Sequence, residues 1–324
     1  MKEIALRHVA KIPPPPKGFK FVSVSVSLQG AAQLLYIETK AESLVHRQTE
    51  SDGFAVFPVP DMGAAFRYRL VTTGGENSRE IDFPPFEFAF PMVDVFADGS
   101  AAIVGSRCRW RSKDDYDVNG MIVDRATGQE IRFLAGDGVQ DIGVDGSDRL
   151  WISYFDEGVY GNFGWGNLDP NGERTPAPVG ASGLNCFDRR GDIVWQHDQE
   201  QQFIDDCYAL NVTRDVTHFY FYSDFDLGHV SSDFTALYRK TDIRGAHAFA
   251  ISPDRVLFSG QYDDPPDRVY LLSLQGDESA KSRTGRLLLP AGKIPKDVTL
   301  IGRGSSLHLF TRKDWYRVTL EEIE

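Results

Sequence analysis

Acidic residues recur at corresponding places of a repeated sequence pattern. In each copy, a short strand-like run ends in a Gly, Asn or Ser turn and is followed by a second, more apolar run. The position five residues before the turn is occupied by Ser25, in the weakest alignment, and then by Asp94, Asp141, Asp206, His247 and Asp297. The pattern predicts that four carboxylates and a histidine gather where the first strands of the repeats begin.

Converging carboxylates repel one another, so their charge must be compensated. A divalent cation such as Ca²⁺ would do this through oxygen ligands. The candidate metal ligands are Asp94, Asp141, Asp206 and Asp297. The same cluster could act as a general acid or base, with His247 as the catalytic residue that moves protons. Alternatively, each Asp accepts hydrogen bonds from backbone N–H groups and joins neighbouring repeats. The sequence leaves these roles open and indicates no other cofactor.

A second group of polar and aromatic residues falls in two loops. The connection at 155–182 is long, and loops of more than about 15 residues in a compact domain are usually functional or disordered. Its aromatic and amide side chains suit stacking on a sugar or holding a peptide; alternatively, the loop is a lid that packs on its own aromatics. Arginines earlier in the chain could bind a carboxylate or phosphate, or balance nearby acids. The candidate ligand-binding residues are Arg107, Arg109, Trp110, Asp156, Glu157, Tyr160, Asn162 and Trp165.

The elements that position these residues are strands. Several repeats continue with a second hairpin, and four strands per unit are typical of a β-propeller blade. We predict an all-β fold, one domain over residues 1–324, as a six-bladed β-propeller with four-stranded antiparallel blades. The expected blades are at about 19–83, 92–134, 139–196, 204–240, 245–289 and 297–320. In such blades, connections after second strands open on the same face as the starts of innermost strands. The long connections at 39–63 and 155–182 are therefore predicted to lie over the acidic residues.

The last blade has only three strands, which leaves a sheet edge open to unwanted pairing. Residues 2–9 alternate in polarity as a strand does, and we predict that they close this blade. The four prolines at 13–16 would then form a stiff bridge into the first blade.

Two segments carry a family resemblance. Gln140 to Ile152, with an acidic-glycine turn before a Leu-Trp strand, resembles the repeat of NHL-type and two-component-regulator propellers. The run from Gly158 to Gly166 is similar to segments of uncharacterised bacterial propeller-like proteins. These resemblances imply the fold and no activity. The architecture also resembles that of gluconolactonase-type propellers, which hold a divalent metal at the channel mouth, and this implies a metal-dependent hydrolase or lactonase as one candidate function.

Composition excludes several classes of partner. The 324 residues include 47 acids and 35 bases, a net charge of −12, which disfavours binding to nucleic acid. No apolar run approaches the roughly 20 residues that span a bilayer, so we expect no membrane partner and a cytoplasmic location. Motifs for a serine nucleophile, a zinc protease or a P-loop are missing. The first hypothesis is therefore a binding or scaffold protein whose partner is a protein, peptide or glycan, and the hydrolase is the alternative.

Overall fold

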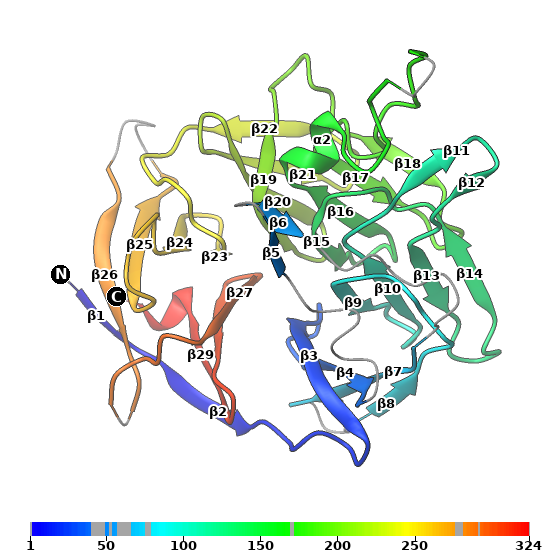
Figure 1. Cartoon of the computed structure of the whole chain (residues 1–324). Coiled ribbons are helices and arrows are strands. Elements are labelled where there is room, and N and C mark those ends of the chain that lie inside the picture. The colour runs from blue at the N-terminus through cyan, green and yellow to red at the C-terminus, as the bar shows by residue number, and fades with distance from the viewer. Residues whose placement is uncertain are drawn as a thin grey trace. The chain divides into compact units, whose positions relative to one another are not determined.

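The computed structural model describes residues 2–39, 49–51, 54–56, 66–74, 79–168, 172–275, 281–290 and 292–323. The chain divides into two compact units. The central unit comprises Pro14–Val144 and Asp148–His197, and the terminal unit comprises Met1–Pro13, Asp145–Ser147 and Asp198–Glu324. Each unit contains three main sheets, whose strands are labelled in Figure 1.

The central unit has three four-stranded antiparallel sheets. The first is β3 (Phe19–Val26), β4 (Ala32–Glu38), β7 (Tyr68–Thr73) and β8 (Arg79–Asp82). The second is β9 (Pro91–Val95), β10 (Ala101–Gly105), β13 (Gly120–Val123) and β14 (Glu130–Phe133). The third is β15 (Val139–Val144), β16 (Leu150–Tyr154), β17 (Leu184–Phe187) and β18 (Ile193–Gln196). Two small hairpins are added, β5 (Thr49–Ser51) with β6 (Phe54–Val56) and β11 (Trp110–Ser112) with β12 (Asp115–Tyr116).

The terminal unit repeats this arrangement. Its first sheet is β19 (Asp206–Val212), β20 (Val216–Tyr222), β21 (Asp226–Ser231) and β22 (Ala236–Arg239). Its second is β23 (Phe249–Ile251), β24 (Arg255–Ser259), β25 (Arg268–Ser273) and β26 (Arg283–Leu288), with β1 (Lys2–Ala5) added at the edge. Its third is β27 (Thr299–Arg303), β28 (Ser306–Phe310) and β29 (Asp314–Thr319), with β2 (Arg7–Lys11) as the fourth strand.

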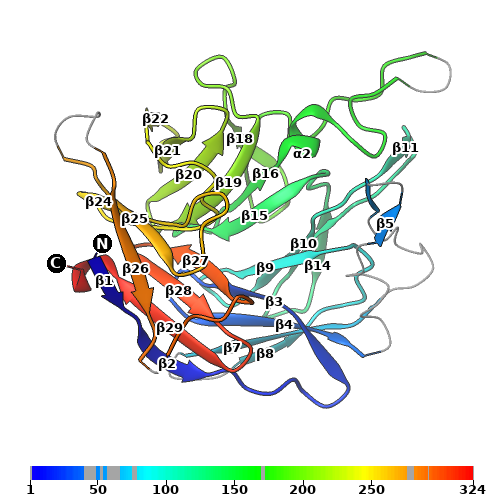
Figure 2. The same cartoon turned by 60° about the vertical axis from the view of Figure 1, so that its left-hand side comes forward.

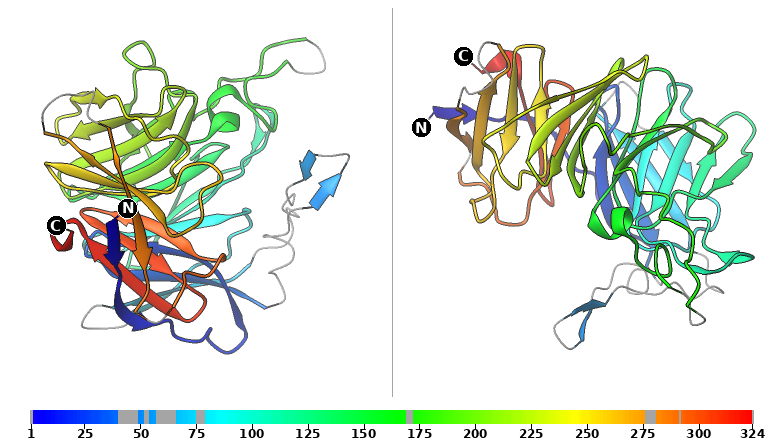
Figure 3. Two further views of the ribbon diagram at one scale, coloured as in Figure 1. Left: turned by 90° about the vertical axis from the view of Figure 1, so that its left-hand side faces the viewer. Right: turned by 90° about the horizontal axis from the view of Figure 1, so that it is seen from above.

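The N-terminal segment therefore belongs to two blades. β2 pairs antiparallel with β29 and closes the last blade, which confirms the prediction, whereas β1 pairs parallel with β26 in the blade before it. Figure 2 shows both strands beside their partners. Leu6 lies between them, is 2% exposed, and donates its backbone N–H to Leu288 O at 2.8 Å. Both views of Figure 3 place the N- and C-termini near each other in this unit.

Six four-stranded antiparallel blades, three in each unit, define an all-β six-bladed β-propeller, as the sequence predicts. The second strand of several blades is buried along its whole length, as in β10 and β16. A strand packed on both faces is apolar at every residue rather than at alternate ones. This explains why the second run of each sequence repeat is the more apolar.

The apolar cores lie between blades within each unit. In the central unit, Leu35, Phe86 and Ile103 belong to one cluster and Val104, Leu150 and Tyr154 to another. In the terminal unit, one cluster joins β1 and β24–β26 to β28 and the 3₁₀ helix Leu320–Glu322.

Helices are short. α2 (Asp156–Tyr160) is a single turn within the connection after β16, and no helix in the described part of the chain is long and apolar enough to cross a membrane. Within the connection at 39–63, the described residues include the hairpin of β5 with β6.

The burial of Leu6 gives a test of the N-terminal closure. Leu6→Ala removes a side chain from a packed site, and such truncations lower the free energy of unfolding by about 2–5 kcal/mol. We expect a loss of this size in urea unfolding, whereas Lys11→Ala, at an exposed position of β2, should have little effect. A Leu6→Ala protein as stable as the wild type would show that the N-terminal segment does not contribute to the core.

Candidate functional site

The carboxylate of Asp94 is buried and fully engaged by its own unit. Its side chain is 1% exposed on β9, and Oδ1 accepts hydrogen bonds from Gln33 Nε2 at 3.0 Å and from Val95 N at 2.8 Å. Oδ2 accepts a hydrogen bond from Val144 N at 2.7 Å. These donors lie on β4, β9 and β15, which belong to three successive blades. Asp94 therefore joins the blades through hydrogen bonds.

Ser25 belongs to the same network, although its alignment is the weakest. Its Oγ lies 2.7 Å from Gln33 Oε1 and 2.8 Å from Val93 O, which places the first blade against the second. Asn211 has the corresponding role in the terminal unit. Its Nδ2 donates to Phe249 O at 2.8 Å, and its Oδ1 accepts from Gly304 N at 2.7 Å. An amide serves here because one partner is an acceptor and the other is a donor.

The other acidic repeat positions lie at a different distance from the end of their strand than Asp94 does. Asp94 is one residue before Val95, the last residue of β9 in the strand pairing. Asp206 is six residues before Val212, and Asp297 lies six residues before Arg303. The turns after β19 and β27 therefore fall later than the sequence pattern suggests, and the common level assumed for the predicted ring is wrong within these blades.

The remaining candidates have separate surroundings. The Asp297 side chain is 80% exposed, with one carboxylate oxygen 3.4 Å from Arg312. Asp141 and Asp206 are partly buried and engaged by other groups. Over the described ranges, no three His, Cys, Asp or Glu side chains come together as a metal site would require. The metal role of Asp94, Asp141, Asp206 and Asp297 stays a prediction.

His247 lies before β23 and stacks on Tyr208, with ring centroids 5.2 Å apart and 17° between the planes. The hydroxyl of Tyr208 is hydrogen bonded to that of Tyr262. Burial against these rings lowers the pKa of His247, which keeps the imidazole neutral near pH 7. Its catalytic role also stays a prediction.

The predicted ligand-binding residues come together on two loops of the central unit, at 105–118 and 155–168. Trp110 N donates to Phe163 O at 2.9 Å, and Trp165 Nε1 donates to Cys108 O at 3.0 Å. Gly164 is necessary because any side chain there would collide with the backbone oxygen of Trp110. The loops therefore form one structure.

A buried arginine and the two acids beside it anchor this structure. Arg107 is 3% exposed, and it pairs with Asp137 Oδ2 at 3.0 Å and with Glu157. Asp137 Oδ1 also accepts the Cys108 N–H at 2.7 Å. Burial raises the pKa of Asp137 to about 7, although the neighbouring Arg107 charge opposes the shift. The pair holds the two loops to the segment between β14 and β15.

The three arginines at 107, 109 and 111 differ in how they are neutralised. Arg111 pairs with Asp115 at 2.8 Å and with Asp117 at 2.9 Å, and Arg107 has the acids described above. Arg109 has no ion pair with any residue in the described ranges. Its guanidinium lies 5.2 Å from the centre of the Phe163 ring, and the Arg107 guanidinium lies 4.4 Å from the same ring. Of these three arginines, Arg109 is therefore the one whose charge is available to a ligand.

Exposure separates the residues that can touch a ligand from those that support the loops. Tyr160 is 58% exposed on α2 and Asp156 is exposed beside it, while Trp110 and Asn162 are partly exposed. Arg107 and Trp165 are buried, at 3% and 4%, and they position the loops. Their role as ligand contacts stays a prediction.

Sequence reasoning missed Asp137 and Asp117, and it placed Phe163 only among the aromatic residues of the 155–182 connection. Asp137 stands between Gly136 and Gly138, both of which have positive φ, and such a flanked acid marks a tightly turned and constrained segment. Phe163 itself has φ 46°, a strained value for an aromatic residue, and its N–H is held by Asn162 Oδ1 at 2.7 Å. The sequence shows that Phe163 lies in the glycine-rich loop, but it does not show the contact of its ring with Arg107 and Arg109.

The chain is similar to known proteins either in sequence over one segment or in fold. Residues 184–275 match the YxzG family, and no curated protein matches the chain. A catalytically inactive virginiamycin B lyase from Staphylococcus aureus with quinupristin is 10% identical, with 96% of this chain and 98% of that chain covered and a TM-score of 0.44. A streptogramin B lyase is 9% identical, with 96% of this chain and 96% of that chain covered and a TM-score of 0.48. The β-propeller domain of the Trilobed protease from Pyrococcus furiosus is 10% identical, with 93% of this chain and 83% of that chain covered and a TM-score of 0.47.

Such identities carry no information about activity. The family match covers less than half of the chain and does not establish membership. What stands is the class of protein: a six-bladed β-propeller, a fold that supports a binding or scaffold role.

The hydrogen bonds of Asp94 predict that it stabilises the fold without metal. In Asp94→Asn one acceptor oxygen becomes an NH₂ group that faces backbone donors, which should lower the free energy of unfolding by about 1.5–3 kcal/mol. Asp297→Asn, at an exposed position, is the matched control and should change little. A melting temperature of the wild type that rises with Ca²⁺ and falls with EDTA would instead support the metal role.

The raised pKa of Asp137 predicts a pH-dependent stability. The folded state retains this proton up to about pH 7, while the unfolded chain loses it near pH 4. Stability from this group is therefore full below pH 4 and is lost as the pH rises to 7, by at most about 1.4 kcal/mol per pH unit. Urea unfolding of the wild type and Asp137→Asn between pH 4 and 8 should show the wild type losing stability relative to the variant. A pH-independent difference would contradict the shift.

Proposed function

We propose that this protein is a binding module that holds an acidic peptide segment of a partner protein on the loops 105–118 and 155–168 of the central unit. The observation that carries the proposal is the guanidinium of Arg109, which has no ion pair with any described residue and lies over Phe163 between two arginines that are already neutralised. Guanidinium groups bind carboxylates through directed N–H donors, and a preformed orientation reduces the entropy lost on binding.

The surroundings of Arg109 favour a peptide. Tyr160 and Tyr116 are exposed at 58% and 42%, and tyrosines provide rigid contact area with a polar end. Tyr116 packs edge-on against the buried Trp165 at 6.4 Å, so its position is fixed by the loop core. A carboxylate at Arg109 with apolar contacts beside it matches a peptide in which Asp or Glu adjoins a larger side chain. The connection at 39–63, predicted on the same face, lies mostly outside the described residues.

The hydrolase or lactonase alternative gains no support of this kind. The oxygens of Asp94 accept hydrogen bonds from backbone and amide donors, and no three of the described acids, histidines and cysteines are placed to hold a metal ion. We therefore keep a divalent metal at the predicted acidic residues as a separate hypothesis and build no reaction on it.

The test is a selection of random peptides displayed on phage against the immobilised protein. We expect the bound peptides to be enriched in Asp or Glu beside an aromatic or aliphatic residue. For a synthetic peptide of the selected sequence, Arg109→Ala should weaken binding by roughly 10- to 100-fold, the usual range for a charged hydrogen bond.

Arg111→Ala is the matched control, since it removes an arginine two residues away whose charge is already paired. It should leave the dissociation constant within about threefold, a difference of less than 1 kcal/mol. Selected peptides without acidic enrichment, or equal binding to wild type and Arg109→Ala, would overturn the proposal.

A further inference from the structure

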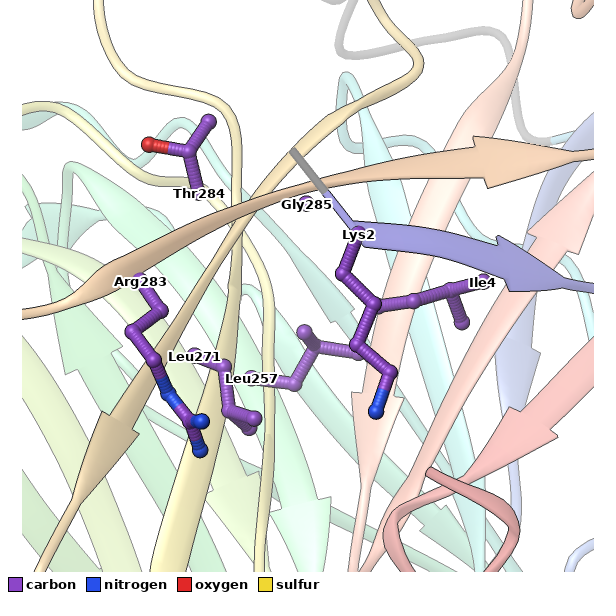
Figure 4. Close-up of a pocket in the computed structure, with 7 residues that line it drawn as sticks. All are labelled: Lys2, Ile4, Leu257, Leu271, Arg283, Thr284 and Gly285. Atoms are coloured by element: carbon purple, nitrogen blue, oxygen red, sulfur yellow. The ribbon is translucent and has the colours of Figure 1, made fainter. Parts of the chain in front are cut away.

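A small cavity opens on one face of the fifth blade, within the terminal unit. Its volume is about 270 Å³, and its walls include Leu257, Leu271 and Ile4 together with Gly285, Lys2 and Arg283. Figure 4 shows the two leucines between the two cationic side chains, whose charged ends point the same way. The cavity thus has an apolar floor and two positive charges at its rim.

Strand register explains why these residues share a face. Leu257 of β24 is paired with Leu271 of β25, which is paired with Arg283 of β26. Lys2 of β1 is paired with Gly285 of β26. Residues directly opposite each other in a sheet project to the same side, as do residues two apart along a strand. The parallel pairing of β1 with β26 therefore brings Lys2 beside Arg283.

Gly285 lies in the wall of the cavity between the two cations. A Cβ atom at this position would lie 3.1 Å from Val269 Cγ2 and 3.2 Å from Ile4 Cδ1. A larger side chain would fill the space over the leucines. Glycine is used here because Val269 and Ile4 would crowd a Cβ atom, and its backbone does not need a positive φ.

Neither cation is neutralised by the part of the chain that the structure describes. Lys2 and Arg283 have no ion pair with any described residue, although Arg286, three residues further along β26, pairs with Asp267. Two positive charges of this kind repel each other, and a bound anion would relieve the repulsion. Inorganic phosphate would be left against leucine side chains, whereas an anion with an apolar body fits both parts of the cavity.

We propose that this cavity binds a small monocarboxylic acid with an apolar body, of the size of a medium-chain fatty acid or an arylacetate. The carboxylate lies between Lys2 and Arg283, and the hydrocarbon covers Leu257 and Leu271 over Gly285. The volume is below that of pockets for drug-sized ligands, which start at about 300 Å³, and this limits the ligand to roughly ten heavy atoms. This site is independent of the peptide surface in the central unit.

Octanoate is the probe, titrated into the full chain by isothermal calorimetry below its micelle concentration. We expect saturable one-site binding, with octanol at least about tenfold weaker because it lacks the charge, and with inorganic phosphate giving no binding. Arg283→Gln and Lys2→Gln should each weaken octanoate by about fivefold or more. Lys11→Gln, which removes an exposed charge from the neighbouring strand β2, should leave the affinity unchanged.

Gly285→Val provides a second test that keeps both charges. It should abolish octanoate binding by filling the hollow, and circular dichroism together with a cooperative melt checks that the variant is folded. If Gly285→Val does not fold, the charge variants decide the matter alone. The proposal is overturned if octanoate does not bind at about 10 mM, if octanol binds equally well, or if both charge variants bind octanoate like the wild type.

Discussion

The central unit depends on one buried carboxylate. A charge out of water is costly unless hydrogen bonds compensate it, and Asp94 obtains these from β4, β9 and β15 at once. The three donors must therefore keep their positions, which fixes β4, β9 and β15 of three successive blades relative to each other. The terminal unit reaches the same end with the neutral amide of Asn211, which bridges β23 and the turn after β27. Blades are joined by directional polar contacts as well as by apolar packing.

The candidate peptide site follows from that constraint. Once β9 and β15 are fixed, β10 and β16 end at defined places, and the loops at 105–118 and 155–168 start from them. Their own contacts then complete the arrangement: the buried Arg107 pair, the Trp165 hydrogen bond and the close approach at Gly164. An ion pair of this kind adds little net stability because desolvation offsets the attraction, but breaking it is expensive. Its value here is position, since it sets Phe163 under the Arg109 guanidinium.

The strands and their grouping into blades were predictable because burial on both faces leaves a mark in composition, as in β10 and β16. The position of each acid along its strand was not predictable, because the place where the strand ends and the turn begins differs by several residues between blades. That place depends on tertiary contacts such as that of Asn211 with Gly304. The roles of Arg107, Arg109 and Arg111 were equally hidden. Their sequence spacing is uniform, and they are distinguished only by acids that the fold brings near, of which Asp137 is 30 residues away from Arg107.

Anion sites on a chain of net charge −12 also require an account of long-range electrostatics. The overall field opposes the approach of a carboxylate, but at physiological ionic strength charges more than about 8 Å apart are largely screened. Affinity is then decided within the site, where Arg109 lies over Phe163 and where Lys2 and Arg283 stand beside an apolar floor. Arg107, Arg111 and Arg189 are paired with acids, whereas Arg109 and Arg283 have no ion pair with any described residue. In such a protein, selective recognition of an anion therefore depends on the local surroundings of a cation that has no acidic partner, and not on the net charge.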